Sequence, residues 1–221
     1  MYKWFAACCV FAAALVLGQL NGLGMYAGIF KQIASTCFIM TAWSAGAKDS
    51  RYGKLILAGL CFSWWGDAFL IKGGDLFFLL GLVSFLTAHV LYSVAFFLHG
   101  VRWNWALGSL VVIIPLITWI MSGIFPSVGA DMKIPIAAYI MVITIMVMLA
   151  VGATARSGTS SIVIGAVFFY FSDISVARGQ FLDTEFPDYV WGLPLYYLGQ
   201  LFLAVSITNS EQNKVEEVNE T

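Results

Sequence analysis

The chain has 221 residues, of which 61% are hydrophobic and only 10% are charged. Soluble domains contain roughly 25% charged residues, so this composition excludes an ordinary soluble protein and indicates a polytopic membrane protein. The formal net charge of -1 provides no basic surface, and we expect no nucleic-acid partner. The four cysteines lie in apolar stretches without a CxxC spacing, which is typical of small side chains in a helical core.

Eight segments are long and apolar enough to cross a bilayer, which requires about 20 residues. They cover residues 3–20, 28–47, 53–72, 76–98, 104–122, 133–152, 160–178 and 189–208. We keep the first of them as a membrane helix rather than a cleaved signal peptide. The predicted fold class is therefore all-α, a bundle of eight transmembrane helices forming one domain over residues 1–208. Residues 209–221 include four Glu, which is typical of a disordered, solvated C-terminal tail.

Lys and Arg residues favour the cytoplasmic side of a membrane protein. With the N-terminus inside, seven of them lie on the inner side and four on the outer side, and the cluster at 48–54 contributes most to this difference. We therefore expect both termini to be cytoplasmic. The expected location is a bacterial cytoplasmic (inner) membrane.

Two acidic residues stand inside predicted spans, Asp67 in the third and Asp173 in the seventh, and each follows a Gly by eight residues. A charged side chain in hydrocarbon costs about a few kcal/mol or more, so such a carboxylate is a candidate functional group. Each Asp is expected about one turn from the outer end of its span. If the two share a partly dry site, they cannot both ionise cheaply, and one is expected to keep its proton. A simple helix-to-helix hydrogen bond is the alternative for each.

The two halves of the chain are candidates for a 4+4 parallel repeat. Asp67 and Asp173 are 106 residues apart, and residues 81–89 match residues 192–200 at a shift of 111. A repeat with an even number of spans has its pseudo-twofold axis along the membrane normal. The aspartates would then lie at similar depth and face one axis. Chance similarity between apolar helices is the alternative explanation.

Other polar side chains within the spans are candidates for binding a substrate or supporting the aspartates, because they must point into the bundle. Lys31, expected at the outer start of the second span, either pairs with a carboxylate, binds a lipid phosphate or snorkels to the interface. Arg178 is interpreted as an interfacial anchor. The remaining candidates are Ser63, His89, Tyr92, Tyr139, Ser172, Tyr196 and Gln200. A purely structural role in interhelical hydrogen bonds stays open for each of them.

Several kinds of site lack support in the sequence. His89 and the two aspartates would be a conceivable metal set, but no HxxxH, CxxC or ExxH spacing accompanies them, and we expect no metal or cofactor. The chain also contains no Walker loop, GxSxG elbow or dinucleotide fingerprint. Phosphoryl transfer and serine-dependent hydrolysis are therefore not supported.

The order and spacing of these residues resemble the YhhN-like lysoplasmalogenase family over about residues 31–200. The similarity rests on Gly66-Asp67, Gly81-x3-Phe85-x3-His89-x2-Tyr92, Tyr139, Gly165, Phe168, Ser172-Asp173, Ala177, Phe181 and Tyr196-Tyr197-x2-Gln200. The family usually has Lys-Pro at the start of the second span, where this chain has Lys31-Gln32. This departure leaves the start of that helix open.

The resemblance implies a membrane ether hydrolase without a cofactor. Its expected substrate is a lysophospholipid, namely an alkenyl-glycerophosphoethanolamine or -choline, whose vinyl ether bond is cleaved to a fatty aldehyde and glycerophosphoethanolamine or glycerophosphocholine. Asp67 and Asp173 would be the catalytic acid and the charge-stabilising base, in an order that the sequence leaves open. Lys31 would hold the phosphate. The residues that would position the water and orient the carboxylates are His89, Tyr92, Tyr139 and Gln200. The hydrocarbon chain would enter from the outer leaflet, between helices.

Two other classes of function remain open at this point. A proton-coupled small-molecule or lipid transporter would suit ionisable groups in a parallel repeat, although no Gly- or Pro-broken helices occur at equivalent positions in the two halves. A lipid-binding or scaffolding membrane protein would use the polar groups to join helices. The headgroup and chain preference, the oligomeric state and the physiological role are not determined by the sequence.

Overall fold

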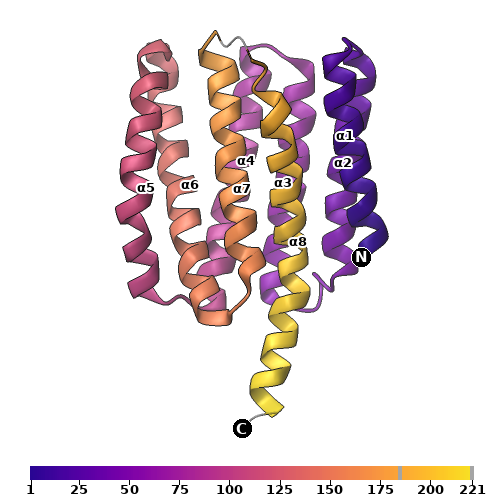
Figure 1. The fold of residues 1–221 in the computed structure, drawn as a ribbon, viewed down its shortest axis with the longest axis vertical. Coiled ribbons are helices and arrows are strands. Elements are labelled where there is room, and N and C mark those ends of the chain that lie inside the picture. Colours follow the sequence, from indigo (N-terminus) through magenta and orange to yellow (C-terminus); the bar gives the residue numbers. More distant parts are fainter. Residues whose placement is uncertain (184–185, 220–221) are drawn as a thin grey trace.

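The computed structural model describes residues 1–183 and 186–219, with side chains up to Thr208. The described part consists of α-helices that run alternately up and down, with one short 3-10 turn (Figure 1). The helices are α1 (Tyr2–Leu20), α2 (Gly24–Ser44), α3 (Arg51–Lys72), α4 (Asp75–His99), α5 (Trp103–Ile124), α6 (Ala130–Ser157), α7 (Ser160–Phe181) and α8 (Tyr189–Asn219), and the turn is η1 (Phe125–Ser127). The predicted all-α bundle of eight helices is confirmed.

The chain is an integral membrane protein. All the described helices except α2 have the length and apolarity of a membrane span. With 21 residues α2 is long enough as well, but Lys31, Gln32 and its hydroxyl-bearing residues lower its mean hydropathy. Because α2 packs against α1, α3 and α8, its polar side chains can face protein instead of lipid.

Several helices extend beyond the ends predicted from apolarity. Helix α2 begins at Gly24, so Lys31 lies about two turns inside it and not at its start. Helix α7 continues to Phe181, which places Asp173 about two turns from its end instead of one. The reason is that an apolar stretch reports the hydrocarbon thickness, whereas a helix persists into the interfacial region.

Both termini lie at the same end of the bundle, where α8 projects beyond the other helices (Figure 1). Thr208 Oγ1 is 3.6 Å from the Met1 sulfur. We call this the terminal end and the opposite one the far end. The cytoplasmic orientation of the terminal end and the bacterial inner membrane stay predictions. So does the solvated, disordered tail over 209–221, because the side chains after Thr208 lie outside the described residues.

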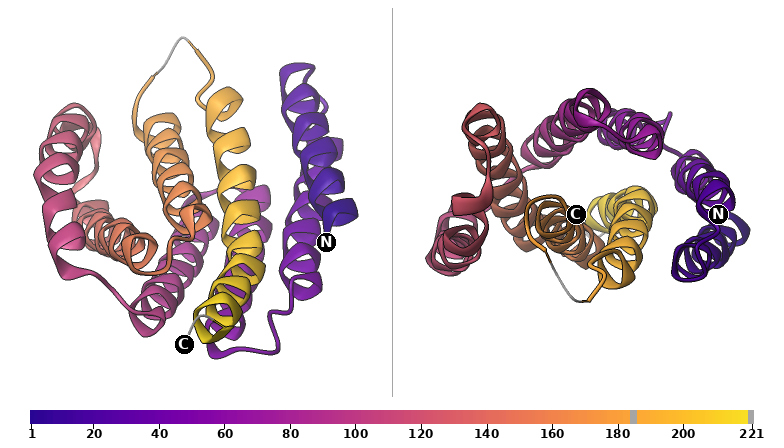
Figure 2. Two further views of the ribbon diagram at one scale, coloured as in Figure 1. Left: turned by 60° about the horizontal axis from the view of Figure 1, so that its bottom comes forward. Right: turned by 90° about the horizontal axis from the view of Figure 1, so that it is seen from above.

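Helices α7 and α8 lie on the concave side of an arc formed by α1 to α6 (Figure 2). Helix α8 packs against α7, α1, α2 and α3, and α7 packs against α6. In the apolar stretch of α8, 56% of the residues are buried, against 11% in α5. The interior of the bundle is therefore built around α7 and α8, whereas α5 is the outermost helix.

The two halves of the chain pack in the same way, which supports the 4+4 parallel repeat. Helix α3 packs on α4 as α7 packs on α8, and the pairs α2–α3 and α6–α7 correspond as well. Gly59 of α3 lies against the ring of Tyr92 of α4, and Gly165 of α7 lies against Leu203 of α8. These contacts are related by the same shifts of 106 and 111 residues that the sequence contains.

The contact at Gly59 leads to a stability prediction. A Cβ atom there would clash with the ring of Tyr92, whose hydroxyl is fixed by a hydrogen bond to Gln200. Gly59→Ala should therefore lower the melting temperature of the detergent-solubilised protein by several degrees. The control is Gly108→Ala in α5, where nothing lies within 4 Å and Ala should be neutral or stabilising. Equal effects of the two changes would contradict this close packing.

Candidate active site

A cavity of about 390 Å³ is lined by residues of α2 to α8 and of the α7–α8 loop. It reaches from the far end to the middle of the bundle. Its polar wall residues are Lys31, Asp67, Tyr139, Tyr170, Ser172, Asp173, Ser175, Asp188, Tyr189 and Tyr196. The two aspartates, which come from α3 and α7, therefore line the same cavity. Most of the remaining wall is aliphatic or aromatic.

Both carboxylate oxygens of Asp67 have partners. The side chain is 2% exposed, and Lys31 Nζ lies 3.2 Å from Oδ1. Ser35 Oγ and the Tyr196 hydroxyl both donate to Oδ2, at 2.5 Å and 2.8 Å. A cation and two hydrogen-bond donors thus surround this buried carboxylate, and each of these contacts favours its charged form.

Ser35 is a partner of Asp67 that the sequence analysis missed. It lies one turn after Lys31 on the same face of α2, and this i, i+4 spacing is the signal that could have found it. Its oxygen also lies 2.9 Å from the Lys31 carbonyl. The Tyr197 hydroxyl donates to the same carbonyl at 3.2 Å, so this turn of α2 is joined to α8 beside Asp67.

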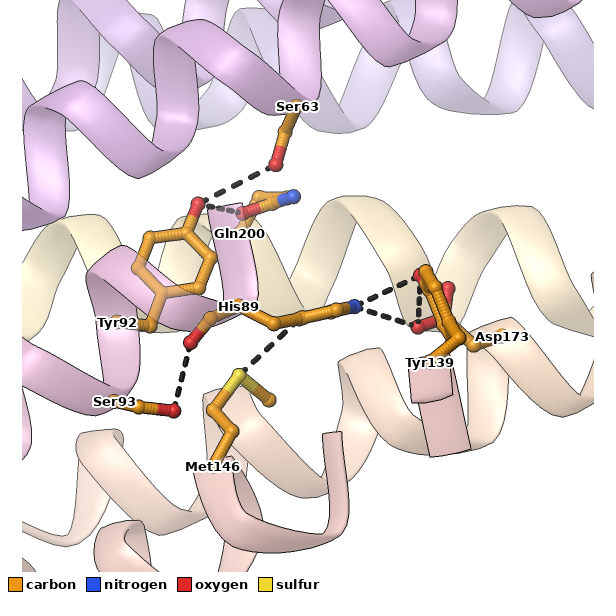
Figure 3. A network of polar contacts seen from close by, with 8 residues as sticks. All are labelled: Ser63, His89, Tyr92, Ser93, Tyr139, Met146, Asp173 and Gln200. Atoms are coloured by element: carbon orange, nitrogen blue, oxygen red, sulfur yellow. Dashed lines mark hydrogen bonds and ion pairs between the residues drawn. The ribbon is translucent and has the colours of Figure 1, made fainter. Parts of the chain in front are cut away.

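Asp173 has a different set of partners, shown in Figure 3. Its Oδ2 accepts a hydrogen bond from the Tyr139 hydroxyl at 2.8 Å and lies 2.9 Å from His89 Nε2. The Tyr139 hydroxyl is also 2.8 Å from Nε2. The side chain of Asp173 is 15% exposed and that of His89 is fully buried, so the carboxylate faces the cavity and the imidazole lies behind it.

The other imidazole nitrogen of His89 faces the thioether of Met146 at 3.3 Å. Sulfur is a weak acceptor, so the strong polar contacts of this histidine are all on the Nε2 side. An imidazole and a carboxyl group in direct contact at a cavity wall are side chains that can serve in acid–base chemistry.

Aromatic rings separate the two carboxylate centres. The ring of Phe169 lies 4.6 Å from that of His89 and 5.4 Å from that of Tyr196, measured between centroids. Phe85 packs edge-on against both Phe169 and Tyr196. Each aspartate thus keeps its own polar surroundings while both face one cavity.

The sequence model of the YhhN family matches residues 26–207, a range that contains both carboxylate centres. The chain belongs to the YhhN family. Lysoplasmalogenase TMEM86A of Bos taurus is 28% identical over 165 residues, which cover 71% of this chain and 66% of that protein. Lysoplasmalogenase TMEM86B of Homo sapiens is 25% identical over 210 residues, which cover 95% of this chain and 87% of that protein. No solved structure matches the chain.

Three of the predicted site residues of this YhhN protein are not among the residues that line the cavity and form a separate set of polar contacts (Figure 3). The Tyr92 hydroxyl donates to Gln200 Oε1 at 2.9 Å and lies 3.5 Å from Ser63 Oγ. All three side chains are fully buried. They join α3, α4 and α8, so their geometry fits support of the site and not contact with a substrate. Ser172, by contrast, lies on the cavity wall beside Asp173.

The two carboxylate centres occupy equivalent places in the repeat. Lys31 of α2 contacts Asp67 of α3, and Tyr139 of α6 contacts Asp173 of α7. A further partner comes from α8 in the first centre and from α4 in the second. Equivalent helices thus supply the partners in each half. The first centre has the cation of Lys31 where the second has the phenol of Tyr139.

The ion pair between Lys31 and Asp67 leads to a prediction about stability. Lys31→Gln leaves a carboxylate that is 2% exposed without its counter-charge, which is strongly destabilising for a buried pair. We expect a lower melting temperature in detergent for Lys31→Gln, and recovery of most of the loss in the double variant Lys31→Gln/Asp67→Asn. Additive losses in the double variant would mean that the two side chains are not coupled.

Proposed function

We propose that this protein is a lysoplasmalogenase that hydrolyses the vinyl ether bond of alkenyl-glycerophosphoethanolamine or -choline. The products would be a fatty aldehyde and glycerophosphoethanolamine or glycerophosphocholine. The names of the relatives support this substrate class. The observation that carries the proposal is a pair of carboxylates with unlike partners, Asp67 with Lys31 and Asp173 with His89, on the wall of one largely apolar cavity inside a membrane bundle.

The reaction requires an acid and an anion on either side of the vinyl ether. Proton transfer to the alkene carbon C2′ leaves an oxocarbenium ion centred on C1′. Water then adds to C1′ and gives a hemiacetal, which collapses to the aldehyde and the glycerol hydroxyl. Glycoside hydrolysis passes through a similar cation and also relies on two carboxyl groups.

The unlike partners of the two aspartates suggest which one is the acid. Asp173 is the catalytic acid in this proposal, because it faces the cavity and is in direct contact with His89. Asp67, which is paired with Lys31, is the anion in this proposal and stabilises the oxocarbenium ion. It then accepts the proton of the attacking water. His89 and Tyr139 are positioning residues that hold the Asp173 carboxyl group.

The second step returns both carboxyl groups to their starting states. Asp173, now a carboxylate, takes the proton of the hemiacetal hydroxyl. Asp67, now protonated, gives its proton to the departing glycerol oxygen. The C1′–O bond breaks, the aldehyde carbonyl forms, and no proton is gained or lost over the cycle. Two carboxyl groups that alternate as acid and base are therefore sufficient, without a cofactor.

The walls of the cavity suit a lipid with a single chain. Aliphatic side chains from α5 and α6 line one part of it, namely Ile117, Met121, Ile136, Ile140 and Ile143. They form a bed for the alkenyl chain, since burying apolar surface there is favourable. The charged residues Lys31 and Asp67 stand on the α2 and α3 side, where the glycerol part would lie.

The position of the cavity favours hydrolysis over transport. Apart from Tyr170 in the middle of α7, its lining residues belong to the halves of the helices near the far end or directly precede α8. The terminal half contains the buried side chains of Tyr92, Met146 and Gln200. A carrier would need a route through this half, so the arrangement supports a site that substrate enters and leaves from one end or from the membrane.

The direct test is aldehyde release by the detergent-purified protein from lysoplasmenylethanolamine, measured with a coupled alcohol dehydrogenase. Asp67→Asn and Asp173→Asn should each lower the rate by a factor of at least about 100, because each removes an acid–base group. Asp75→Asn, at an exposed position in the first turn of α4, is the control and should leave the rate unchanged. Full activity of either active-site variant would refute the assignment, and a stable wild-type protein that releases no aldehyde would refute the function.

A second prediction concerns His89. His89→Gln keeps a hydrogen-bonding side chain beside Asp173 but cannot exchange a proton. We expect kcat to fall while KM stays nearly constant, and the pH dependence of kcat to change shape, since both report the acid and not substrate binding. Tyr92→Phe, in the separate set of polar contacts, should change mainly the melting temperature. A raised KM at unchanged kcat in His89→Gln would contradict the positioning role.

A further inference from the structure

We propose that Arg178, held by Asp188 at the far end of the cavity, binds the phosphate of the lysophospholipid headgroup. This inference rests on the proposed function and adds a binding subsite to it. The subsite lies beyond the two carboxylate centres, at the junction of α7 with the α7–α8 loop.

Arg178 has a buried partner, which an interfacial anchor does not need. Its Nε donates to Asp188 Oδ1 at 2.9 Å. Trp191 Nε1 donates to the same oxygen at 3.3 Å. The side chain of Asp188 is 4% exposed, whereas that of Arg178 is 42% exposed. A buried carboxylate thus fixes a partly accessible guanidinium, instead of leaving it to move in the interface as a snorkelling side chain does.

Asp188 stands at the wall of the cavity, and Arg178, which is not itself a lining residue, is bonded to it. Asp188, Ser175 and Gly179 are among the residues that line it. A Cβ atom on Gly179 would lie 3.8 Å from the Asp188 side chain, so Asp188 packs directly against this turn of α7. The bond to Asp188 uses Nε, and a guanidinium carries four further N–H donors on its two Nη atoms. Such a planar, permanently charged group is well suited to binding phosphate oxygens in pairs.

The spacing along α7 matches the length of the substrate. Arg178 follows Asp173 by five residues, which is about 7.5 Å along a helix axis. In a lysoplasmalogen, six bonds join the vinyl ether carbon C1′ to the phosphorus atom, and in extended form they span roughly 7 Å. With the vinyl ether at Asp173, the phosphate lies at the level of Arg178.

Lys31, which the sequence suggested as the phosphate-binding residue, is engaged elsewhere. Its Nζ contacts Asp67, and its side chain is 13% exposed. At this depth it stands beside a catalytic carboxylate and neutralises its charge. A second anion there would compete with Asp67 for the same cation, so the phosphate is better placed at Arg178.

The repeat supplies a matched control. Lys72 at the end of α3 is equivalent to Arg178 at the shift of 106, and Phe77 is equivalent to Asp188 at the shift of 111. There the cation lies over an aromatic ring, with Lys72 Nζ 4.9 Å from the centroid of Phe77. Lys72 is exposed. Lys72 has the same charge as Arg178 and lies at the equivalent position at the same end of the bundle, but its partner is the ring of Phe77 and not a buried carboxylate.

The experiment compares a substrate that carries the phosphate with one that lacks it. Alkenyl-glycerophosphoethanolamine and 1-alkenylglycerol have the same reacting bond. We expect Arg178→Gln to raise KM for the phospholipid about tenfold or more, as the loss of one charge-assisted contact does, and to leave 1-alkenylglycerol unchanged. Arg178→Lys should keep part of the preference, and Asp188→Asn should weaken it because the guanidinium is no longer held. Lys72→Gln should have no effect.

A binding measurement separates this subsite from the proposed hydrolysis. The alkyl ether analogues, 1-O-alkyl-glycerophosphoethanolamine and 1-O-alkylglycerol, cannot be cleaved by this route, and their binding is followed by calorimetry. Tighter binding of the phosphate-bearing analogue, lost in Arg178→Gln but not in Lys72→Gln, supports the subsite even if wild-type protein releases no aldehyde. Equal binding of both analogues by the wild type, or an equal loss for both in Arg178→Gln at an unchanged melting temperature, would overturn it.

Discussion

A carboxylate inside a membrane bundle requires a counter-charge, and Lys31 provides it for Asp67. Lys31 Nζ lies 3.2 Å from Asp67 Oδ1, and both side chains are almost completely buried. Electrostatic attraction as well as packing therefore holds α2 and α3 in one register. Tyr196 adds α8 to the same centre. Lys31, the cationic side chain on the cavity wall, is thus already paired with Asp67. Asp173 must therefore be stabilised by neutral or titratable partners, Tyr139 and His89.

The duplication of the bundle explains how two such centres come to face one cavity. Equivalent helices of the two halves, α3 and α7, each place one carboxylate on the wall of the shared cavity. The halves then differ in the residues around each carboxylate, a fixed cation in one and a histidine in the other. Two carboxyl groups with unlike partners are the arrangement on which the proposed acid–base chemistry rests. In that proposal the repeat provides the scaffold, and the divergence between its halves provides the acid and the base.

Much of this architecture could be predicted from the sequence, because long apolar runs interrupted by short polar segments specify membrane helices. Asp67 and Asp173 were recognisable because carboxylates are rare in such runs. Which helix lies beside each of them was not, since local spacing defines a face of a helix but not its neighbour. Ser35 and Asp188 were missed for this reason. Ser35 lies on a different helix from Asp67, and Asp188 lies outside the helices, at a position that depends on the folded bundle.

The most direct test of the central claim is hydrolysis by the wild-type protein in deuterium oxide, with the aldehyde trapped by reduction and analysed by mass spectrometry and chiral NMR. Protonation of the alkene carbon by one carboxyl group on the cavity wall predicts a single deuterium on the carbon next to the former carbonyl, in one configuration. An aldehyde without deuterium at that carbon, or with both configurations in equal amounts, would contradict the account.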